Sequence, residues 1–456
     1  MGIQEICEAQ RKYFRTGATK EVSFRLEMLR KLKAALKAHE AKICEALQAD
    51  LGKGRTESYM SEIGMVLAGL NDTLRHLKKW AKPRRVWAPL AHFPSTCKVL
   101  SEPYGVTLVM SPWNYPVLLC LDPLIASLSA GNCCVVKPAS MSAHVSAALK
   151  EMLESVFPRE YVAVVLGNEV SHEDLLAQEF DYIFFTGSPR VGHTVMKAAA
   201  EHLTPVTLEL GGKSPCILTG SANLRVAAHR IAFGKILNSG QTCVAPDYAL
   251  VPRGMKEAFI AEFKKAVSEM LGDSPLANAA YPHIINRKHF DRLSGLIAGS
   301  TAVCGGKGAP ETLRIEPTLL DDVTAESPCM QEEIFGPILP LICYDDLAEV
   351  EDFVLSRPKP LACYIFSTKG KEIKRLQKAL PYGGGCVNDT IVHLAVHGMP
   401  FGGVGNSGMG SYHGKAGFDT FTHYKSCLSK ANWLDLPFRY QPYNSLKERL
   451  LRLFLR

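Results

Sequence analysis

The stretch FFTGSPRVG, residues 184–192, carries more information about the fold than any other part of the chain. An apolar run ends here, Gly187 permits a tight turn, Ser188 is a favourable N-cap and Pro189 suits the first position of a helix. The segment Arg190–Glu201 that follows has helical composition. The stretch therefore predicts a strand, a turn and a helix whose N-terminal amides can face an anionic pyrophosphate. Its Gly-x4-Gly spacing differs from the dinucleotide fingerprint, so an ordinary strand–helix turn is the alternative.

On both sides of this stretch, apolar runs of strand length alternate with segments of helical composition. Short apolar runs are separated by segments rich in Ala, Leu, Met and Lys, such as Ser142–Phe157 and Arg190–His202. This alternation is typical of βαβ units with a parallel sheet, and two α/β lobes are the simplest arrangement. The apolar runs are Val106–Met110, Cys133–Val136, Val162–Leu166, Tyr182–Phe185, Val206–Leu210, Tyr248–Val251, Ile338–Tyr344 and Ala362–Phe366.

Outside these runs, helical spacing of apolar residues predicts a helix over residues 20–52 that ends at Gly52. The apolar stretch Val117–Val136 holds Asp122, Pro123 and Gly131, and so predicts a buried helix, a turn and a core strand rather than a membrane span.

Composition limits the function classes. The 456 residues suggest two or three domains, and 47% hydrophobic with 21% charged residues is ordinary for a globular protein rather than a disordered or fibrous one. A net charge of +7 over this length does not indicate a nucleic-acid partner. The 14 cysteines form no Cys-x-x-Cys pair, which favours a reducing compartment. The N-terminus lacks an apolar signal segment, so we expect a cytoplasmic protein.

Three residues have the chemistry of a catalytic site. Glu209 ends an apolar strand before a Gly-Gly turn, where a carboxylate is either bound by backbone amides or kept desolvated as a general base. Cys243 follows a small polar turn whose dipoles could lower a thiol pKa, although a structural thiol is the alternative. Asn114 follows the strand Val106–Met110, where its amide either holds an oxyanion or caps a turn.

Seven motifs occur in an order that resembles the aldehyde dehydrogenase superfamily. The longer stretches HLTPVTLELGGKSPC (202–216) and SGQTCVAPDY (239–248) resemble its class 3 branch, and the resemblance covers roughly residues 20–430. The motifs are SPWNYP (111–116), KPAS (137–140), FFTGSPRVG (184–192), LELGGK (208–213), GQTC (240–243), EEIFGPI (332–338) and PFGGVGNSGMG (400–410).

The resemblance implies an α/β fold with two Rossmann-like open parallel-sheet lobes and a small β-hairpin bridging element. In this division, residues 1–82 and 103–211 form the dinucleotide-binding domain and 212–410 the catalytic domain. Residues 83–102 and 411–430 form the bridging and oligomerisation element, and 431–456 a tail with an amphipathic helix. The family also implies that Tyr412–Cys427 is a hairpin that adds strands to a partner subunit at Val86–Glu102, giving a homodimer.

The family assigns Cys243 as the nucleophile that attacks an aldehyde, and the Asn114 amide with the Cys243 backbone N–H as the oxyanion hole. Glu209 is the expected base for hydrolysis of the thioester. Glu333 is expected to hold the nicotinamide ribose, with a share of the base role as the alternative.

The implied cofactor is NAD and/or NADP, and no metal ion is expected. Lys137 matches a lysine near the adenine ribose. Many relatives carry Glu at the position of Ser140, and because a carboxylate there would repel a 2′-phosphate, Ser140 favours acceptance of NADP. The further cofactor-binding residues expected are Trp113, Gly187, Ser188, Gly192, Glu209, Leu210, Glu333 and Phe335.

The expected substrate is an apolar aldehyde, aliphatic of medium or long chain or aromatic, because the residues placed along the substrate tunnel carry no charge. Two rival functions are acyl transfer to coenzyme A and a structural or light-filtering role without catalysis. The tunnel residues are Met65, Leu119, Phe233, Leu237, Ile391 and Phe401, the last also near the nicotinamide.

The C-terminal stretch SLKERLLRLFLR, residues 445–456, predicts a short amphipathic helix. Packing on its own domain is the simplest interpretation. A lid over the substrate tunnel, a dimer contact and peripheral docking on a membrane surface are the alternatives.

Overall fold

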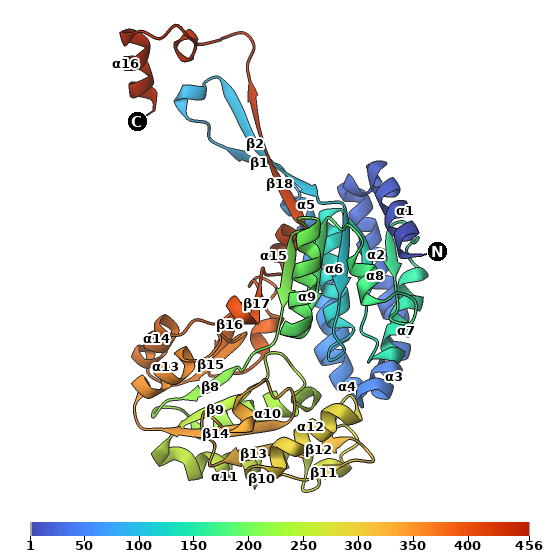
Figure 1. The fold of residues 1–456 in the computed structure, drawn as a ribbon, viewed down its shortest axis with the longest axis vertical. Coiled ribbons are helices and arrows are strands. Elements are labelled where there is room, and N and C mark those ends of the chain that lie inside the picture. Colours follow the sequence, from blue (N-terminus) through green and yellow to red (C-terminus); the bar gives the residue numbers. More distant parts are fainter. Residues whose placement is uncertain (1, 456) are drawn as a thin grey trace.

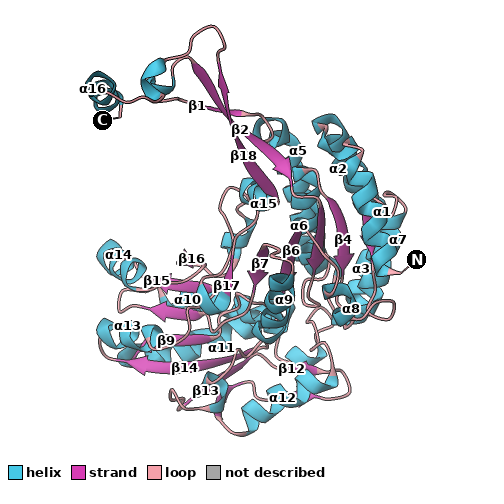
Figure 2. Cartoon of the chain, turned by 45° about the horizontal axis from the view of Figure 1, so that its top comes forward, coloured by secondary structure: helices cyan, strands magenta, loops and turns pink. Residues whose placement is uncertain are grey.

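The computed structural model describes residues 2–455 as two sheet-containing lobes and an arm that projects from the first lobe (Figure 1). Both sheets and the arm can be followed by their strands in Figure 2. The α/β class and the two parallel-sheet lobes predicted from the sequence are confirmed.

The first lobe is built on a six-stranded sheet in the order β17-β7-β6-β3-β4-β5. Five strands are parallel, and β17 joins the edge antiparallel to β7, pairing Gly408 with Glu209. β17 comes from the segment expected in the catalytic domain, and the N–H of Leu210 also donates to the carbonyl of Ser407 at 3.1 Å. The strands are β3 (Val106–Met110), β4 (Cys133–Lys137), β5 (Val162–Val164), β6 (Tyr182–Thr186), β7 (Val206–Glu209) and β17 (Gly408–Met409).

Helices cover this sheet. The helical structure expected over residues 20–52 is confirmed, as two helices that meet at His39, whose backbone leaves the helical region (φ −96°, ψ 4°). The predicted end at Gly52, in a left-handed conformation, is confirmed. The helical segments are α1 (Ile3–Arg15), α2 (Val22–Ala38), α3 (Glu40–Leu51), α4 (Arg55–Ser58), the π-helical η2 (Tyr59–Ile63), α5 (Gly64–Trp80), α6 (Leu118–Ala130), α7 (Ala143–Glu154), α8 (His172–Leu176) and α9 (Pro189–Glu201).

The strand, turn and helix predicted from residues 184–192 are confirmed as β6 and α9. The Ser188 side chain accepts a hydrogen bond from the N–H of Val191, and Pro189 is the first helical residue. Because α9 begins at the carboxyl end of β6, a central strand of the sheet, its free N-terminal amides face the edge where ligands of α/β sheets bind.

The second lobe is built on a seven-stranded sheet in the order β10-β13-β14-β9-β8-β15-β16, parallel except for β10. Its strands are β8 (Pro215–Leu218), β9 (Tyr248–Pro252), β10 (Thr301–Cys304), β13 (Thr318–Asp321), β14 (Ile338–Tyr344), β15 (Ala362–Phe366) and β16 (Gly384–Val387), beside a small pair β11 (Gly308–Ala309) and β12 (Arg314–Ile315). Its helices are α10 (Leu224–Ile236), α11 (Lys256–Leu271), α12 (Arg287–Ala298), α13 (Leu347–Leu355) and α14 (Gly370–Ala379).

The arm is a three-stranded antiparallel sheet of β1 (Arg84–Val86), β2 (Ser95–Pro103) and β18 (Thr422–Lys430). The hairpin expected over residues 412–427 is wrong, because α15 (Gly414–Thr420) occupies its first half. β18 pairs with β2 of the same chain over nine residues, from Thr422 with Pro103 to Lys430 with Ser95. The outer edge of β18 therefore remains open within one chain.

The tail helix α16 (Ser445–Phe454) lies at the tip of the arm, far from both lobes (Figure 1). The helix contacts the tail and the arm of its own chain, with the ring of Phe454 stacked on that of Phe438 at 5.7 Å, and it does not reach either lobe. Leu446 and Leu453 of its apolar stripe are 64% and 61% exposed. Within residues 2–455, every helix is too short or too polar to cross a lipid bilayer.

Candidate active site

Cys243 is presented by a left-handed turn that follows α10. Asn238, Ser239 and Gly240 have φ angles of 50°, 51° and 69° in succession. A side chain at Gly240 would meet the carbonyl of Gly336 at 2.3 Å, so this position requires glycine. The turn reverses the chain within three residues and leaves Cys243 half-buried rather than sealed in the core.

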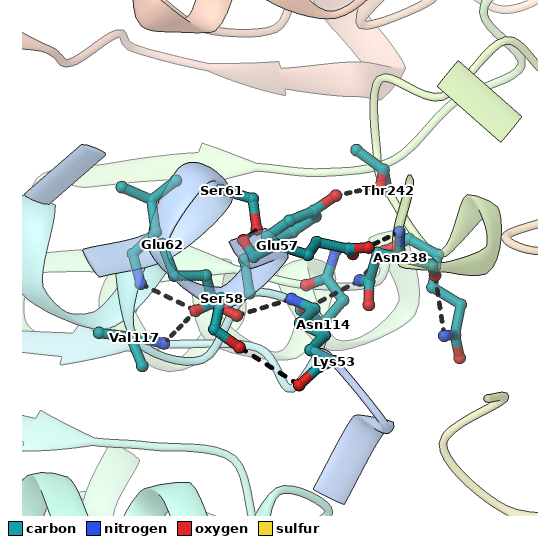
Figure 3. Close-up of polar contacts among 12 residues, drawn as sticks. Lys53, Glu57, Ser58, Ser61, Glu62, Asn114, Val117, Asn238 and Thr242 are labelled. Atoms are coloured by element: carbon teal, nitrogen blue, oxygen red, sulfur yellow. Dashed lines mark hydrogen bonds and ion pairs between the residues drawn. The ribbon is translucent and has the colours of Figure 1, made fainter. Parts of the chain in front are cut away.

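Asn114 lies directly against this turn. Its side-chain Nδ2 donates to the carbonyl of Gln241 at 3.0 Å, and its own carbonyl accepts from Nδ2 of Asn238 at 2.8 Å (Figure 3). The neighbouring Tyr115 hydroxyl bonds the hydroxyl of Thr242 at 2.7 Å. A carboxamide nitrogen has two hydrogens, so one N–H of Asn114 is available for a ligand beside Cys243.

Glu209, at the end of β7, is 2% exposed, and neither carboxylate oxygen has a hydrogen-bond partner among the described residues. Burial raises the pKa of this carboxyl well above its usual range. Of the two interpretations left open by the sequence, backbone amides do not bind this carboxylate, and the desolvated carboxylate is the one the geometry supports.

Glu333 approaches the same centre from the loop before β14. A side chain at Gly211 would lie 1.9 Å from Oε2 of Glu333, so this glycine allows the close approach. Burial, and then the charge of Asp247, raise the pKa of Glu333 to about 8, although the N–H of Gly212 acts in the opposite direction.

The thiol of Cys243 does not have the lowered pKa expected from its polar turn. Burial raises its pKa, and the nearby carboxylates of Glu333 and Glu209 add to this effect. The N–H groups of Cys243 and Val244 lower the pKa by a smaller amount. The expectation is wrong because the two acids arrive from other elements, and their proximity to one sulfur is a property of the fold.

A polar cradle that fits an adenosine ribose lies at the end of β4. Ser140 is exposed, and Lys137 is buried with Nζ donating to the carbonyl of Pro138 at 3.2 Å. A Cβ atom at Gly167 would lie 1.9 Å from Oγ of Ser140 and 3.4 Å from Nζ of Lys137. The two polar atoms are therefore at most 5.3 Å apart, and only a glycine at position 167 lets the Ser140 side chain approach the backbone this closely.

The other residues expected at the cofactor are found along the same sheet edge. The N–H of Gly187 donates to the carbonyl of Glu209 at 3.0 Å, and Gly192 in α9 lies so close to Leu210 that an added Cβ would meet it at 2.8 Å. The rings of Trp113 and Phe335 stack edge to face at 5.3 Å. These residues follow β3, β6 and β7 or face them, so the set fits a dinucleotide across the carboxyl ends of the strands.

The six residues expected around the substrate come from several different elements. Met65 is in α5, Leu119 in α6, Phe233 in α10, Leu237 in the turn after it, Ile391 in the loop after β16 and Phe401 in the bridge to Tyr412. Phe401 stacks on His413 at 5.4 Å, and Nε2 of His413 lies 3.4 Å from Oδ2 of Asp122. Phe401 is therefore backed by an imidazole and a half-buried carboxylate that the sequence pattern did not reveal.

Sequence reasoning also missed a charged cluster beneath Asn114, formed by Lys53, Glu57 and Glu62. Its only indication in the sequence is a lysine between two glycines, Gly52 and Gly54. No group of three His, Cys, Asp or Glu within residues 2–455 is placed to hold a metal ion.

Comparisons with known proteins agree with this geometry. The sequence profile of the aldehyde dehydrogenase family matches residues 2–427. The chain is 45% identical to 4,4′-diaponeurosporen-aldehyde dehydrogenase of Staphylococcus aureus, over 94% of each chain. It is 41% identical to the dog protein named aldehyde dehydrogenase, dimeric NADP-preferring, over 96% of this chain and 98% of that one.

The structure of Staphylococcus aureus AldH in a substrate-bound state superposes with a TM-score of 0.98 at 43% identity, covering 100% of this chain and 99% of that one. The expected class 3 branch is confirmed by relatives that carry the family 3 name. The chain therefore belongs to the aldehyde dehydrogenase family, whose enzymes are oxidoreductases that use NAD or NADP.

Proposed function

We propose that this enzyme oxidises apolar aldehydes to carboxylic acids through a thioester on Cys243, which water activated by Glu209 then hydrolyses. The observation that carries the proposal is the convergence of a half-buried thiol, the free N–H of Asn114 and a buried carboxylate without hydrogen-bond partners.

In the first step, the thiol of Cys243 releases its proton to solvent, Sγ bonds to the aldehyde carbon, and the electron pair of the carbonyl π bond moves to the oxygen as negative charge. Nδ2 of Asn114 and the backbone N–H of Cys243 donate to this oxygen. Loss of one such donor typically costs about 2.7–4 kcal/mol of transition-state stabilisation. NAD or NADP, when bound, supplies the hydride acceptor that the oxidation needs.

The second step is hydrolysis of the thioester, for which a water molecule must lose a proton. Glu209 is favoured as the base because both of its carboxylate oxygens lack a hydrogen-bond partner among the described residues and burial raises its pKa, which makes it a stronger base than an exposed carboxylate. Glu333 receives the N–H of Gly212 and is assigned to positioning the cofactor ribose. A share of the base role for Glu333 is the second candidate, because its pKa of about 8 is also poised for it.

The substrate is proposed to be an aliphatic aldehyde of medium or long chain or an aromatic one. The support is the absence of charge among the six residues expected at the substrate, and the Staphylococcus aureus relative whose name refers to 4,4′-diaponeurosporen-aldehyde. His413 stacks on Phe401 and lies 3.4 Å from Oδ2 of the half-buried Asp122, so this carboxylate has a polar partner of its own.

A homodimer is proposed to form through the arm. The open edge of β18 offers unpaired backbone groups to a second chain, and the dog relative is named dimeric. In such a dimer α16 would reach the partner subunit, as a lid or as a contact. Peripheral membrane docking through α16 and a cytoplasmic location stay predictions, and the 14 free thiols favour a reducing compartment.

Acyl transfer to coenzyme A uses the same thioester, but the unpaired Glu209 beside Cys243 favours hydrolysis. The test is a panel of short, long and aromatic aldehydes with NAD and NADP, followed by coenzyme absorbance, with and without coenzyme A. We expect turnover with long and aromatic aldehydes, no acyl-CoA, and no turnover by Cys243→Ser. Turnover by Cys243→Ser, or acyl-CoA as the main product, would contradict the proposal.

A further inference from the structure

A buried ion pair lies beneath the proposed oxyanion site and has no part in the chemistry described above. Nζ of Lys53 is 2.6 Å from Oε1 of Glu62, and both side chains are 0% exposed (Figure 3). Removing two charges from water is costly, and such a pair persists only where its remaining donors and acceptors are satisfied. The partners of this pair therefore indicate which part of the fold it organises.

Lys53 uses its other contacts on the loop that carries Asn114. Nζ donates to the carbonyl of Asn114 at 2.8 Å and lies 4.0 Å from the centre of the Tyr115 ring, whose hydroxyl bonds Thr242. Oε2 of Glu62 accepts from the N–H of Val117 at 2.8 Å, where the loop enters α6. The pair thus fixes this loop at three successive points, one of which is the peptide of the proposed oxyanion donor.

Glu57, about one helical turn from Glu62, contacts the turn 238–240 that precedes Cys243. Its Oε1 accepts from the backbone N–H of Asn238 at 2.8 Å, at the first of the three left-handed residues. Asn238 in turn donates through Nδ2 to the carbonyls of Asn114 at 2.8 Å and Gln241 at 3.0 Å. Burial raises the pKa of Glu57 to about 7, against the effects of Lys53 and of this N–H.

The contacts meet at one atom. The carbonyl oxygen of Asn114 accepts from Lys53 on the side of the first lobe and from Asn238 on the side of the second. Because this carbonyl is fixed from both sides, the direction of the Asn114 side chain relative to Cys243 depends on both donors. Non-glycine residues in left-handed conformations need such external support to persist.

We propose that Lys53 and Glu57 are positioning residues for the aldehyde-oxidising site: Lys53 holds the peptide of Asn114, and Glu57 holds the turn 238–240 that presents Cys243. The proposal rests on the proposed function, in which Cys243 attacks the aldehyde and Asn114 stabilises the oxyanion. Neither residue touches the reacting atoms.

Two reactions of the same sulfur separate the two roles. Aldehyde oxidation needs both Cys243 and the oxyanion donor. Alkylation by iodoacetamide needs the sulfur alone: the sulfur–carbon bond forms, the carbon–iodine bond breaks, iodide leaves and the thiol proton goes to solvent. Modification of the Cys243 peptide is followed by mass spectrometry, with Cys243→Ser as the background for the other 13 cysteines.

For Lys53→Met we expect kcat for aldehyde oxidation to fall by roughly tenfold or more, because a small displacement of a catalytic group has this effect. The rate of Cys243 alkylation should stay within about twofold of the wild type. For Glu57→Ala we expect both rates to fall, because the turn itself loses its support. Glu57→Gln keeps an acceptor for the N–H of Asn238 and should restore both rates.

Lys53→Met leaves the Glu62 charge buried without a partner, so the fold could fail. The double variant Lys53→Met/Glu62→Gln removes both charges and keeps an acceptor for the N–H of Val117. If the single variant does not fold, the two rates of the double variant test the role of Lys53. Asp181→Asn is the matched control: its carboxylate accepts from the N–H of Val106 at 2.7 Å, at the opposite end of the sheet. This control should match the thermal unfolding of the test variants while both rates stay unchanged.

Equal losses of oxidation and alkylation in Lys53→Met and in the double variant, or no loss of oxidation in either, would overturn the role of Lys53. Unchanged alkylation in Glu57→Ala would overturn that of Glu57. Failure of the proposed function is distinct, because it would appear as aldehyde turnover by Cys243→Ser.

Discussion

The substitution Ser140→Glu tests the coenzyme site where the sequence departs from many relatives. In the structure Oγ of Ser140 and Nζ of Lys137 are at most 5.3 Å apart across the space left by Gly167. A coenzyme 2′-phosphate paired with Lys137 would then lie about 5 Å from a carboxylate at position 140. A phosphate carries about −1.5 to −2 charges at neutral pH, so the two groups repel each other.

The magnitude follows from Coulomb's law. At about 5 Å, a pair of unit charges interacts with about 0.8 kcal/mol at the dielectric constant of water and about 3.3 kcal/mol at an effective value of 20. Ser140 is exposed, so the lower value applies, and the phosphate charge brings the repulsion to roughly 1.5 kcal/mol. We expect Kd and KM for NADP to rise about tenfold, while those for NAD stay unchanged or fall.

The assay is coenzyme binding by quenching of protein fluorescence, together with KM for each coenzyme at a saturating aldehyde. Ser140→Gln is the matched control, because it adds the same length without charge and should affect both coenzymes alike. The effect should shrink at high salt. An equal loss for NAD and NADP in Ser140→Glu, or a tenfold loss of NADP binding in Ser140→Gln, would refute the electrostatic reasoning.

Four further outcomes are expected. Asn114→Ala should lower kcat for aldehydes by about 10²–10³-fold with Cys243 alkylation retained, and a loss of alkylation would contradict the oxyanion role. Glu209→Gln should lower aldehyde turnover by about 10²-fold or more, because thioester hydrolysis loses its base, while Cys243 is still alkylated by iodoacetamide; unchanged turnover would argue against the base role. Asp122→Asn should stabilise the fold by up to roughly 3 kcal/mol above pH 6 and by about half as much at pH 5. The reason is that burial raises the Asp122 pKa from 3.8 to about 6, so the native carboxyl loses stability as the pH rises through this window; a pH-independent change in Tm would be inconsistent. Deletion of residues 445–456 should change KM for long-chain aldehydes more than for short-chain ones if α16 covers the partner subunit, and equal changes would exclude a lid.

The strands and the strand–turn–helix at residues 182–201 could be predicted because their information is local. Apolar runs of strand length, an N-cap serine and a proline at the first helical position determine these elements within about 20 residues. The break at His39 could not be predicted in this way, since no glycine or proline interrupts the helical pattern there. The local pattern also does not determine whether β18 pairs with its own chain or with a partner, because β2 and a partner strand offer it the same backbone hydrogen bonds.

Sequence motifs predicted the candidate site. The parts that were missed depend on contacts between residues that are far apart in the chain. Charged residues such as Glu62, in a helical segment, are normally assigned to the solvent face, so the two glycines beside Lys53 were the only indication of the buried pair. The expectation of a lowered Cys243 pKa was wrong because it considered only the local turn. Its turn contributes donors, as expected, but Glu209 and Glu333 lie 34 and 90 positions away in the chain, and the fold alone brings them to the sulfur.

The edge pairing of β17 with β7 has a consequence for the motion of the enzyme. The second half of the chain returns to complete the first sheet, with Gly408 opposite Glu209 and the carbonyl of Ser407 bonded to Leu210. A movement of the two lobes away from each other would break these hydrogen bonds, which lie beside Glu209, the proposed base. Small-angle scattering should accordingly give the same radius of gyration before and after saturation with coenzyme.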